Sequence, residues 1–578
     1  MNFFDMRFLS FIGIKKIPEA PWKKYYKKTD MKINLHNENI YTFVKNKVVN
    51  HYDKTAINYY GNKYTYRELF NRIDACAIKY QMLGVKKYDI VSIVSANIPE
   101  AVISIYALNK IGAVANLLHP LLSENEIKDA LNLYKTKYLL IMDVGLKKIN
   151  KIIDDTNVKK IIIMSPSDSM KKIKKVIYKI VSYKNRYRGE LDKRYIKWKN
   201  FLKLDKEYKE FINVVKRDDP ALILQSGGST GTPKGIVLSN GNINAATISA
   251  LRVCSDLDKS DSILGIMPIF HGFGLEVSIN DAFSVGAEVI LIPTFKARKF
   301  DDLLRKYKPS VLVGVPTLFE ALTTNKNMDD VDLSNLKYVI SGGDTLSKER
   351  VLNINKFLHE HGSRTNMIQG YGLTEAVAAV CTDLKVGGRP GTIGIPWPGI
   401  YIKIFEPNSE KPVPYDSDGE ICICGPVVML GYYNNESETN QALKFHKDGN
   451  VWLHTGDIGS MDSDGFITYK QRLKRMIISS GYNVYPSQIE EVLSKHDAVL
   501  AVSVIGIPHP YKVEVPKACI VLKKGYHKSD KLIEELNSLC QKNLAHYSLP
   551  KEYEFMDSLP KTIVGKVDFN KLQKKEEE

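Results

Sequence analysis

One short loop of this sequence carries the residue types that bind polyphosphate. Residues 221–224 are apolar and predict a strand, which runs into Gln225-Ser-Gly-Gly-Ser-Thr-Gly-Thr-Pro-Lys-Gly235. Exposed backbone amides in such a loop can surround phosphate oxygens, hydroxyl groups can donate further hydrogen bonds, and the lysine supplies positive charge. We therefore expect a polyphosphate site made of Ser226, Gly227, Gly228, Ser229, Thr230, Gly231 and Lys234.

This loop differs from the Walker phosphate loop. Gly235 follows the lysine where that motif has Ser or Thr, and Ile236-Val-Leu238 predicts a strand where that motif begins a helix. A turn rich in Gly, Ser and Thr is by itself more often only a loop. The Pro-Lys-Gly ending makes this one more specific.

Five further blocks follow the loop in order. They are Gln369-Gly-Tyr-Gly-Leu-Thr-Glu375, Trp452-Leu-His-Thr-Gly-Asp457, Arg472-Leu-Lys474, Ser480-Gly-Tyr-Asn-Val-Tyr-Pro486 and Pro560-Lys-Thr-Ile-Val-Gly-Lys566. Together with the loop they resemble the motifs of the adenylate-forming superfamily, which contains acyl-CoA synthetases, luciferases and peptide-synthetase adenylation domains. The resemblance covers about residues 35–570 and is nearest to medium- and long-chain fatty acid–CoA ligases.

The resemblance implies a nucleotide site. Glu375 would hold Mg²⁺ against ATP oxygens, because hard cations prefer carboxylate ligands. Thr374 would contact phosphate, Tyr371 would lie against the adenine, and Asp457 with Arg472 would bind the ribose hydroxyls. The other expected members are Gln369, Gly370, Gly372 and the turn Gly342, Gly343 and Asp344, where glycine lets the backbone approach the base closely.

Lys566 would ordinarily be a solvated surface residue. It matches the family lysine that bridges the acid's carboxylate and the α-phosphate, and so stabilises negative charge during attack. Little acid–base chemistry is needed, because a carboxylic acid is already ionised at neutral pH and pyrophosphate is a good leaving group. The expected catalytic residues are Lys566, Glu375, Thr230 and Lys234.

The family's second step transfers the acyl group to the thiol of coenzyme A after the small C-terminal domain rotates. Lys474 matches the hinge of that rotation, and Gly481 and Tyr482 would lie in the loop on the CoA side. Two residues depart from the usual hinge pattern: Gln471 stands where Gly or Asp is common, and Arg475 where an acidic residue is common.

The acid pocket is expected in Met267-Pro-Ile-Phe-His-Gly-Phe-Gly-Leu275, which resembles the corresponding segment of acyl- and aryl-CoA ligases. His271 and Phe273 would form its wall, with Gly342 beside them. The stretch has no aspartate to pair with an amino group, which argues against an α-amino acid, because burying an unpaired ammonium is costly. Two glycines leave room for an aliphatic chain, so our hypothesis is a medium- or long-chain fatty acid.

Strand and helix patterns alternate along most of the chain, which predicts parallel sheets covered by helices. Strands are expected at 90–94, 138–142, 160–164, 288–292, 311–314 and 338–341, and helices at 68–83, 100–111, 124–133, 300–307, 316–323 and 348–361. We expect a multi-lobed α/β fold: a leader (1–34), an adenylation domain (35–471) of βα-layered sheets with a small barrel-like subdomain, and a mobile α+β domain (472–578). The Ile-Cys-Ile-Cys run predicts that Cys422 and Cys424 are small buried hydrophobes and not metal ligands.

The formal net charge of +17 is concentrated in one segment. Between Lys171 and Lys203 there are thirteen Lys or Arg but only Glu190 and Asp192. Residues 170–181 place apolar side chains at helical spacing with lysines between them, which predicts a basic amphipathic helix. Its apolar stripe is expected to dock on its own domain, the commoner arrangement, while the other interpretation is contact of 170–203 with an anionic membrane.

Other functions stay open at this point. The acyl group could go to an acyl-carrier protein, the adenylate could be oxidised as in luciferases, or the chain could bind nucleotide and acyl ligand without turnover. No nucleic-acid recognition motif accompanies the charge. Seven scattered cysteines, no convincing signal peptide and no long apolar stretch predict a cytoplasmic protein, soluble or peripheral at the inner membrane face.

Overall fold

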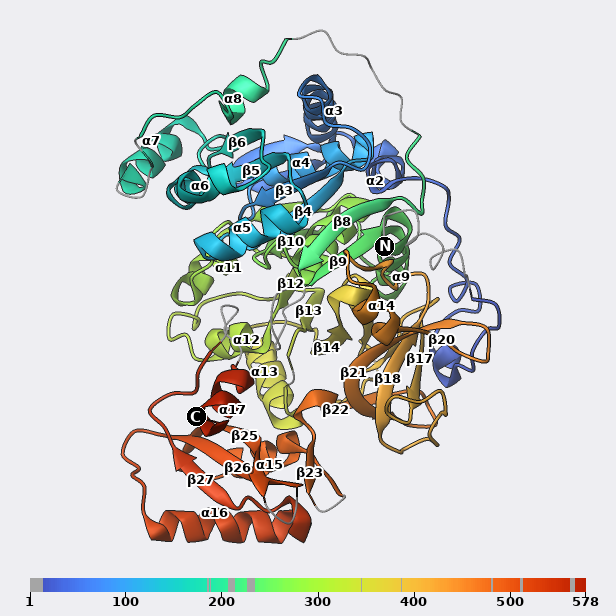
Figure 1. The fold of residues 1–578 in the computed structure, drawn as a ribbon, viewed down its shortest axis with the longest axis vertical. Coiled ribbons are helices and arrows are strands. Elements are labelled where there is room, and N and C mark those ends of the chain that lie inside the picture. The colour runs from blue at the N-terminus through green and yellow to red at the C-terminus, as the bar shows by residue number, and fades with distance from the viewer. Residues whose placement is uncertain are drawn as a thin grey trace.

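The computed structural model describes residues 14–577, with gaps at 184–186, 188, 206–213, 226–233, 345, 386, 480–481, 510–512 and 562–566. Several predicted site residues therefore lie outside the described residues: Ser226, Gly227, Gly228, Ser229, Thr230, Gly231, Gly481 and Lys566. Figure 1 shows an upper body of layered sheets and helices, a smaller sheet beside its lower part, and a C-terminal unit at the bottom.

An eight-stranded sheet carries the strand that leads into the predicted phosphate loop. Its order is β19-β9-β8-β4-β3-β5-β6-β7, parallel except where β9 pairs with β8 and β19. All residues of β3, β4 and β5 are buried, as expected for strands with helices on both faces. The bounds are β3 Ile90–Val94, β4 Val114–Leu118, β5 Tyr138–Met142, β6 Lys160–Met164, β7 Tyr195–Lys197, β8 Pro220–Gln225, β9 Gly235–Ser239 and β19 Gly431–Tyr432.

A nine-stranded sheet lies beside it, in the order β16-β15-β14-β13-β12-β10-β11-β1-β2. Its middle is parallel, so β13 and β14 present their carboxyl ends at the same edge, where ligands of α/β folds usually bind. The bounds are β1 Thr55–Tyr59, β2 Asn62–Thr65, β10 Ser262–Gly265, β11 Glu288–Leu291, β12 Val311–Gly314, β13 Tyr338–Ser341, β14 Met367–Gly372, β15 Ala379–Thr382 and β16 Ile395–Pro396.

The covering helices begin where the sequence places capping residues. Capping boxes at Thr65 with Glu68 and at Ser123 with Glu126 start α3 and α5, and Pro99 starts α4. The bounds are α2 Ile40–Lys47, α3 Tyr66–Met82, α4 Pro99–Ile111, α5 Glu124–Leu133, α6 Leu146–Ile152, α8 Trp198–Phe201, α9 Asn240–Val253, α10 Asp281–Val285, α11 Phe300–Tyr307, α12 Pro316–Thr323 and α13 Lys348–Glu360. The predicted alternation is confirmed.

Past β16 the chain forms an antiparallel, barrel-like sheet. It consists of β17 Tyr401–Phe405, β18 Gly419–Cys424, β20 Leu443–Phe445, β21 Val451–Met461 and β22 Ile467–Arg472, with α14 Glu436–Ala442 between β19 and β20. The predicted burial of Cys422 and Cys424, in β18, is confirmed.

The C-terminal unit is a separate α+β sheet with its own apolar core around Ile489, Leu493, Ile520 and Leu536. Figure 1 shows it below the rest of the molecule, with α16 along its outer edge. Its bounds are β23 Ile477–Ser479, β24 Tyr482–Val484, β25 Val499–His509, β26 Val513–Leu522, β27 Glu552–Phe555, α15 Pro486–Ser494, α16 Asp530–Asn543 and α17 Phe569–Glu577.

The basic amphipathic helix forms as α7, Lys172–Val181, but the predicted docking of its apolar stripe is wrong. Ile173 is 78% exposed and Ile180 is 71% exposed. The helix is attached through its polar side, where Lys174 Nζ donates to the carbonyl of Tyr60 at 2.6 Å. Among the described residues, no helix is long and apolar enough to cross a membrane.

The acid-pocket segment continues into a π-helix, Phe273–Asn280, that the sequence did not predict. It buries Glu276, whose Oε1 accepts a hydrogen bond from the Thr247 hydroxyl at 2.6 Å. Burial raises the pKa of Glu276 to about 7, and burial together with Glu276 raises the pKa of the neighbouring Asp281. At a pH between about 4.3 and about 7, the folded protein therefore keeps a proton on Glu276 that the unfolded chain has released.

Replacing Glu276 with Gln should change how stability depends on pH. In the wild type, stability should fall as pH rises from about 4.3, the unfolded pKa, to about 7, because only the folded state keeps the proton in that window. Glu276→Gln cannot ionise and keeps an acceptor for Thr247, so at pH of about 8 it should be more stable than the wild type by on the order of 1–3 kcal/mol. Urea unfolding across this range measures the difference, and parallel pH curves for the two proteins would contradict it.

Candidate active site

Side chains from two sheets meet at the carboxyl end of β14. The Tyr371 hydroxyl donates a hydrogen bond to Asp457 Oδ2 at 2.6 Å, and Arg472 Nε lies 2.9 Å from Asp457 Oδ1. Asp457 and Arg472 face each other on the paired strands β21 and β22. The contact therefore joins the nine-stranded sheet to the barrel-like sheet.

The Asp457 side chain is 1% exposed, whereas the Arg472 side chain is 55% exposed. Burial raises the pKa of Asp457, and Arg472 and the Tyr371 hydroxyl act against that rise by stabilising the carboxylate. Burial and then Asp457 raise the pKa of Tyr371, so its hydroxyl stays protonated and remains a donor. The result is a buried anion that accepts one hydrogen bond, from Tyr371, and forms one ion pair with Arg472, whose guanidinium is half-exposed and can be reached by a ligand.

Glu375 lies in the 3₁₀ turn Thr374–Ala376, directly after β14. Its Oε1 accepts a hydrogen bond from the Tyr432 hydroxyl at 2.9 Å. Lys234 Nζ lies 5.1 Å from the centroid of the same tyrosine ring and donates to Glu438 Oε2 at 2.6 Å. One tyrosine thus connects the lysine of the predicted phosphate loop with the carboxylate predicted to hold magnesium.

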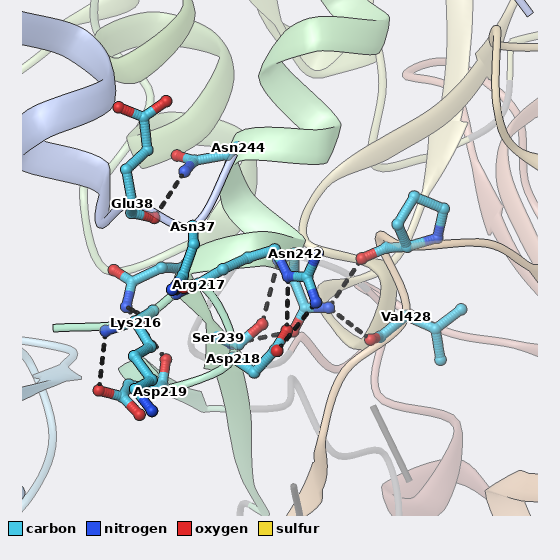
Figure 2. A network of polar contacts seen from close by, with 12 residues as sticks. Asn37, Glu38, Lys216, Arg217, Asp218, Asp219, Ser239, Asn242, Asn244 and Val428 are labelled. Carbon is cyan, nitrogen blue, oxygen red and sulfur yellow. Dashed lines mark hydrogen bonds and ion pairs between the residues drawn. The ribbon is translucent and has the colours of Figure 1, made fainter. Parts of the chain in front are cut away.

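The segment that carries Tyr432 is fixed to the start of α9. Ser239 and Asn242 form a capping box there, and the Asn242 side chain also donates to the carbonyls of Pro426 and Val428, each at 2.8 Å. Figure 2 shows both hydrogen bonds leaving Asn242 toward this segment. Strand β9 begins directly after Lys234 and ends directly before α9. The hydrogen bonds of Asn242 therefore position Lys234 and Tyr432 relative to each other.

The predicted acid-pocket residues lie against the same strand ends. A Cβ atom on Gly342 would stand 3.3 Å from Cζ of Phe273 and 3.3 Å from the carbonyl oxygen of Gly370. The His271 ring centroid lies 4.8 Å from that of Phe270 and 6.4 Å from that of His119. Phe273 and Gly342 are therefore in contact, as the acid and nucleotide sites would require.

A strained turn fixes this segment against Glu375. A Cβ atom on Gly272 would stand 1.9 Å from the carbonyl oxygen of Val377, and one on Gly274 would stand 2.0 Å from that of Pro268, so only glycine fits at either position. The expectation that these two glycines leave room for an aliphatic chain is therefore wrong, because backbone carbonyls fill the space. Val377 has φ of 71° and ψ of −65°, and the amide of Ala378 donates to the carbonyl of Ala376 at 2.9 Å. A β-branched residue in this γ-turn is strained, and such strain is typical of functional sites.

Comparison with known proteins decides the family. The sequence pattern of AMP-binding enzymes matches residues 44–433, and that of the AMP-binding enzyme C-terminal domain matches residues 488–566. This chain belongs to the AMP-binding enzyme family. The two matched regions together cover most of the chain.

Relatives of this AMP-binding enzyme match along nearly their whole length. A long-chain-fatty-acid–CoA ligase of Bacillus subtilis (strain 168) is 34% identical over 568 residues, 97% of this chain and 99% of its own length. A long-chain-fatty-acid–CoA ligase of Haemophilus influenzae is 30% identical over 565 residues, 95% and 97% of the two chains. The crystal structure of ATP-bound MatB from Rhodopseudomonas palustris shares the fold, with a TM-score of 0.80 at 24% identity, covering 93% and 99% of the two chains.

The other described residues predicted for the nucleotide site of this AMP-binding enzyme lie around the carboxyl ends of β13 and β14. Gln369 Oε1 accepts from the amide of Leu346 at 3.3 Å, and a Cβ atom on Gly372 would stand 1.6 Å from the carbonyl oxygen of Ala378. Gly343, at φ of 83°, and Asp344 follow β13, and Thr374 begins the turn after β14. Tyr482 begins β24 in the C-terminal unit.

Lys474 lies between the two units, in the 3₁₀ turn Leu473–Arg475. The neighbouring Arg475 departs from the usual motif, and its Nη2 lies 2.5 Å from Glu490 Oε1 on α15. Its guanidinium also lies 3.7 Å from the ring centroid of Phe569. The arginine therefore ties the segment after β22 to the C-terminal unit.

Three polar residues of the site, Tyr432, Glu438 and Glu420, were not predicted from the sequence. Tyr432 and Glu438 contact Glu375 and Lys234, but nothing in their spacing marks them. Glu420 accepts from the amide of Gly456 at 2.9 Å and is bonded to His454 Nδ1 at 2.8 Å, which fixes the backbone beside Asp457. A glutamate inside the apolar strand β18 was the available signal, since buried carboxylates are rare unless they are paired.

Gly272→Ala should damage both the fold and the activity of this enzyme. The added methyl group would meet the Val377 carbonyl, which cannot move without displacing the Glu375 turn. We expect a loss of unfolding free energy of about 2–4 kcal/mol and at least tenfold lower ATP–pyrophosphate exchange. Gly61→Ala is the control, because that site has space but φ of 84° and should lose only about 1 kcal/mol. Equal stability of the two variants would contradict the tight contact.

Proposed function

We propose that this AMP-binding enzyme is an ATP-dependent acyl-CoA synthetase. In the first step a carboxylate oxygen bonds to the α-phosphorus of ATP and pyrophosphate leaves. In the second the thiol of coenzyme A bonds to the acyl carbon, and AMP leaves with the electron pair of the broken acyl–oxygen bond. The observation that carries the proposal is the convergence of Tyr371, Asp457, Arg472, Glu375 and Lys234 beyond β14.

The nucleotide would lie at the carboxyl ends of β13 and β14. Asp457 and Arg472 would bind the ribose hydroxyls, because a carboxylate accepts and a guanidinium donates hydrogen bonds. Gly342 and Gly343 would let the backbone approach the base closely, because neither has a Cβ atom. The other proposed nucleotide contacts are Asp344, Gln369, Gly370, Tyr371, Gly372 and Thr374.

Glu375 fits a magnesium ion. Its carboxylate provides oxygen ligands, and its hydrogen bond from Tyr432 uses only Oε1 and leaves ligand capacity on Oε2. When bound, the ion would neutralise phosphate charge. Lys234 would add positive charge close by once a phosphate competes with Glu438 for its ammonium group.

The remaining catalytic residues are proposed from the sequence. Ser226, Gly227, Gly228, Ser229, Thr230 and Gly231 would surround the outer phosphates. Lys566 would stabilise the charge between the acid and the α-phosphate. For the second step we propose a boundary at Gln471–Arg472, a hinge at Lys474, and Gly481 with Tyr482 on the CoA side.

We propose that the acid is a medium- or long-chain fatty acid. The relatives named above are long-chain-fatty-acid–CoA ligases, which supports this substrate class. His271 and Phe273 would form the pocket wall, and Phe273 already contacts the nucleotide side at Gly342. Transfer to an acyl-carrier protein is the alternative second step.

We also propose that the protein works in the cytoplasm and touches an anionic membrane through residues 170–203. The exposed apolar side of α7 favours this contact over a nucleic-acid partner, because a nucleic acid would use the lysines alone.

A panel of acids tests the proposed reaction. With ATP, Mg²⁺ and coenzyme A, octanoate and palmitate should give acyl-CoA masses and AMP, whereas benzoate should not. Lys566→Ala should lose adenylate formation by at least about a hundredfold yet still convert a supplied acyl-adenylate with CoA. Thioester formation from benzoate only would refute the fatty acid, and absence of pyrophosphate release with every acid would refute the synthetase.

A further inference from the structure

Helix α7 is attached to the protein by the side that an amphipathic helix normally leaves in solvent. Lys174 Nζ donates to the Tyr60 carbonyl at 2.6 Å, and the Tyr178 hydroxyl donates to Asp143 Oδ1 at 3.1 Å. These two residues and the buried Ser182 are spaced four apart, so they form one face of the helix. This polar face is the one that contacts the upper body.

The opposite side of α7 is apolar and exposed. Ile173, Ile177 and Ile180 follow helical spacing along it, with Val176 and Val181 beside them. All five are more than half exposed, and none of the ten residues of the helix is buried. Figure 1 shows α7 at the outer end of the upper body, and in this view no helix or strand of the described residues lies beyond it. A soluble chain with this pattern would ordinarily turn these side chains inward, so the arrangement points to a partner surface.

The charge around the stripe restricts what that partner is. Lys171, Lys172, Lys175 and Lys179 accompany the stripe, and among the described residues no carboxylate forms an ion pair with any of them. Burial first, and then Lys306 and Lys171, lower the pKa of Lys174, which shows that positive groups also gather where the helix meets the body. Apolar side chains next to unpaired lysines match the apolar interior and anionic headgroups of a lipid surface.

We infer that α7 is a membrane-docking element that inserts Ile173, Val176, Ile177, Ile180 and Val181 into the headgroup layer of an anionic bilayer. Lys174 and Tyr178 hold the helix to the enzyme, and the other lysines contact lipid phosphates. Tyr183, just past the helix, is also exposed, and an aromatic side chain there would suit the membrane–water interface. The choice of a lipid surface also rests on the proposed fatty acid substrate, which would be delivered from such a surface.

Vesicle co-sedimentation tests the inference on the full chain. Wild type should bind vesicles of phosphatidylglycerol and phosphatidylcholine at about 50 mM NaCl and lose most binding at about 500 mM. Ile173→Ser with Ile180→Ser should weaken binding at least tenfold, and so should Lys172→Glu with Lys179→Glu. The control for the isoleucines is the double variant Leu352→Ser with Leu500→Ser, at two other exposed apolar positions. The control for the lysines is the double variant Lys356→Glu with Lys531→Glu, at two other exposed lysines. Each control variant should bind vesicles as wild type does.

Several outcomes would overturn the inference. They are no binding by wild type at low salt, full binding by the isoleucine variant, equal binding to pure phosphatidylcholine, or a wild-type dimer in sedimentation that the isoleucine variant loses. The last result would make a second copy of the chain the partner of α7. Thioester formation from octanoate in the absence of lipid is measured in parallel. An active enzyme that does not bind vesicles refutes only the docking, whereas binding without acid-dependent activity refutes only the proposed function.

Discussion

A buried carboxylate between two sheets is the constraint around which the candidate site is arranged. Asp457 is almost fully removed from solvent, and an unpaired charge there would be strongly destabilising. Tyr371 reaches it from the end of β14, and Arg472 reaches it from β22. This one group therefore links the nine-stranded sheet to the barrel-like sheet, at the strand that leads into the C-terminal unit.

A second constraint is the close packing of the acid segment against the Glu375 turn. Gly272 leaves no room for a side chain beside Val377, and Phe273 rests on Gly342. Any acid held by this segment is therefore near the ends of β13 and β14, where the nucleotide residues lie. Two substrates that must react need their atoms brought within contact distance, and rigid backbone on both sides provides this.

The strands and helices could be predicted where periodicity was strong. Residues 90–94, 138–142 and 160–164 are strands with the expected bounds, because fully apolar runs of this length suit central parallel strands. Strand β4 was missed because only two residues separate it from α4. Strand β10 was missed because only Ile263 and Leu264 of its four residues are apolar, whereas the equally short β12 and β13 each have three. The orientation of α7 could not be predicted, since the same amphipathic pattern fits a helix that docks inward and one that faces outward.

Site residues inside the ordered motif blocks could be predicted from the sequence. Residues outside these blocks, which reach the site only through the fold, could not. Tyr371, Asp457 and Arg472 came from ordered blocks, and the structure brings them together. Tyr432 lies 57 residues from Glu375 in sequence, so only the pairing of β19 with β9 reveals that its hydroxyl reaches that carboxylate. Glu420 likewise acts through a strand partner, and cross-strand neighbours are not visible in one sequence.

Binding of AMP to the Tyr371→Phe variant, measured by calorimetry, tests the central role of Asp457 most directly. The variant removes one donor from a buried carboxylate, a hydrogen bond worth about 1.5–3 kcal/mol, so affinity should fall at least roughly tenfold. The control is Tyr401→Phe, at a buried tyrosine of the barrel-like sheet, and it should bind AMP as wild type does. Unchanged AMP affinity in Tyr371→Phe would show that the Asp457 contact does not prepare the nucleotide site.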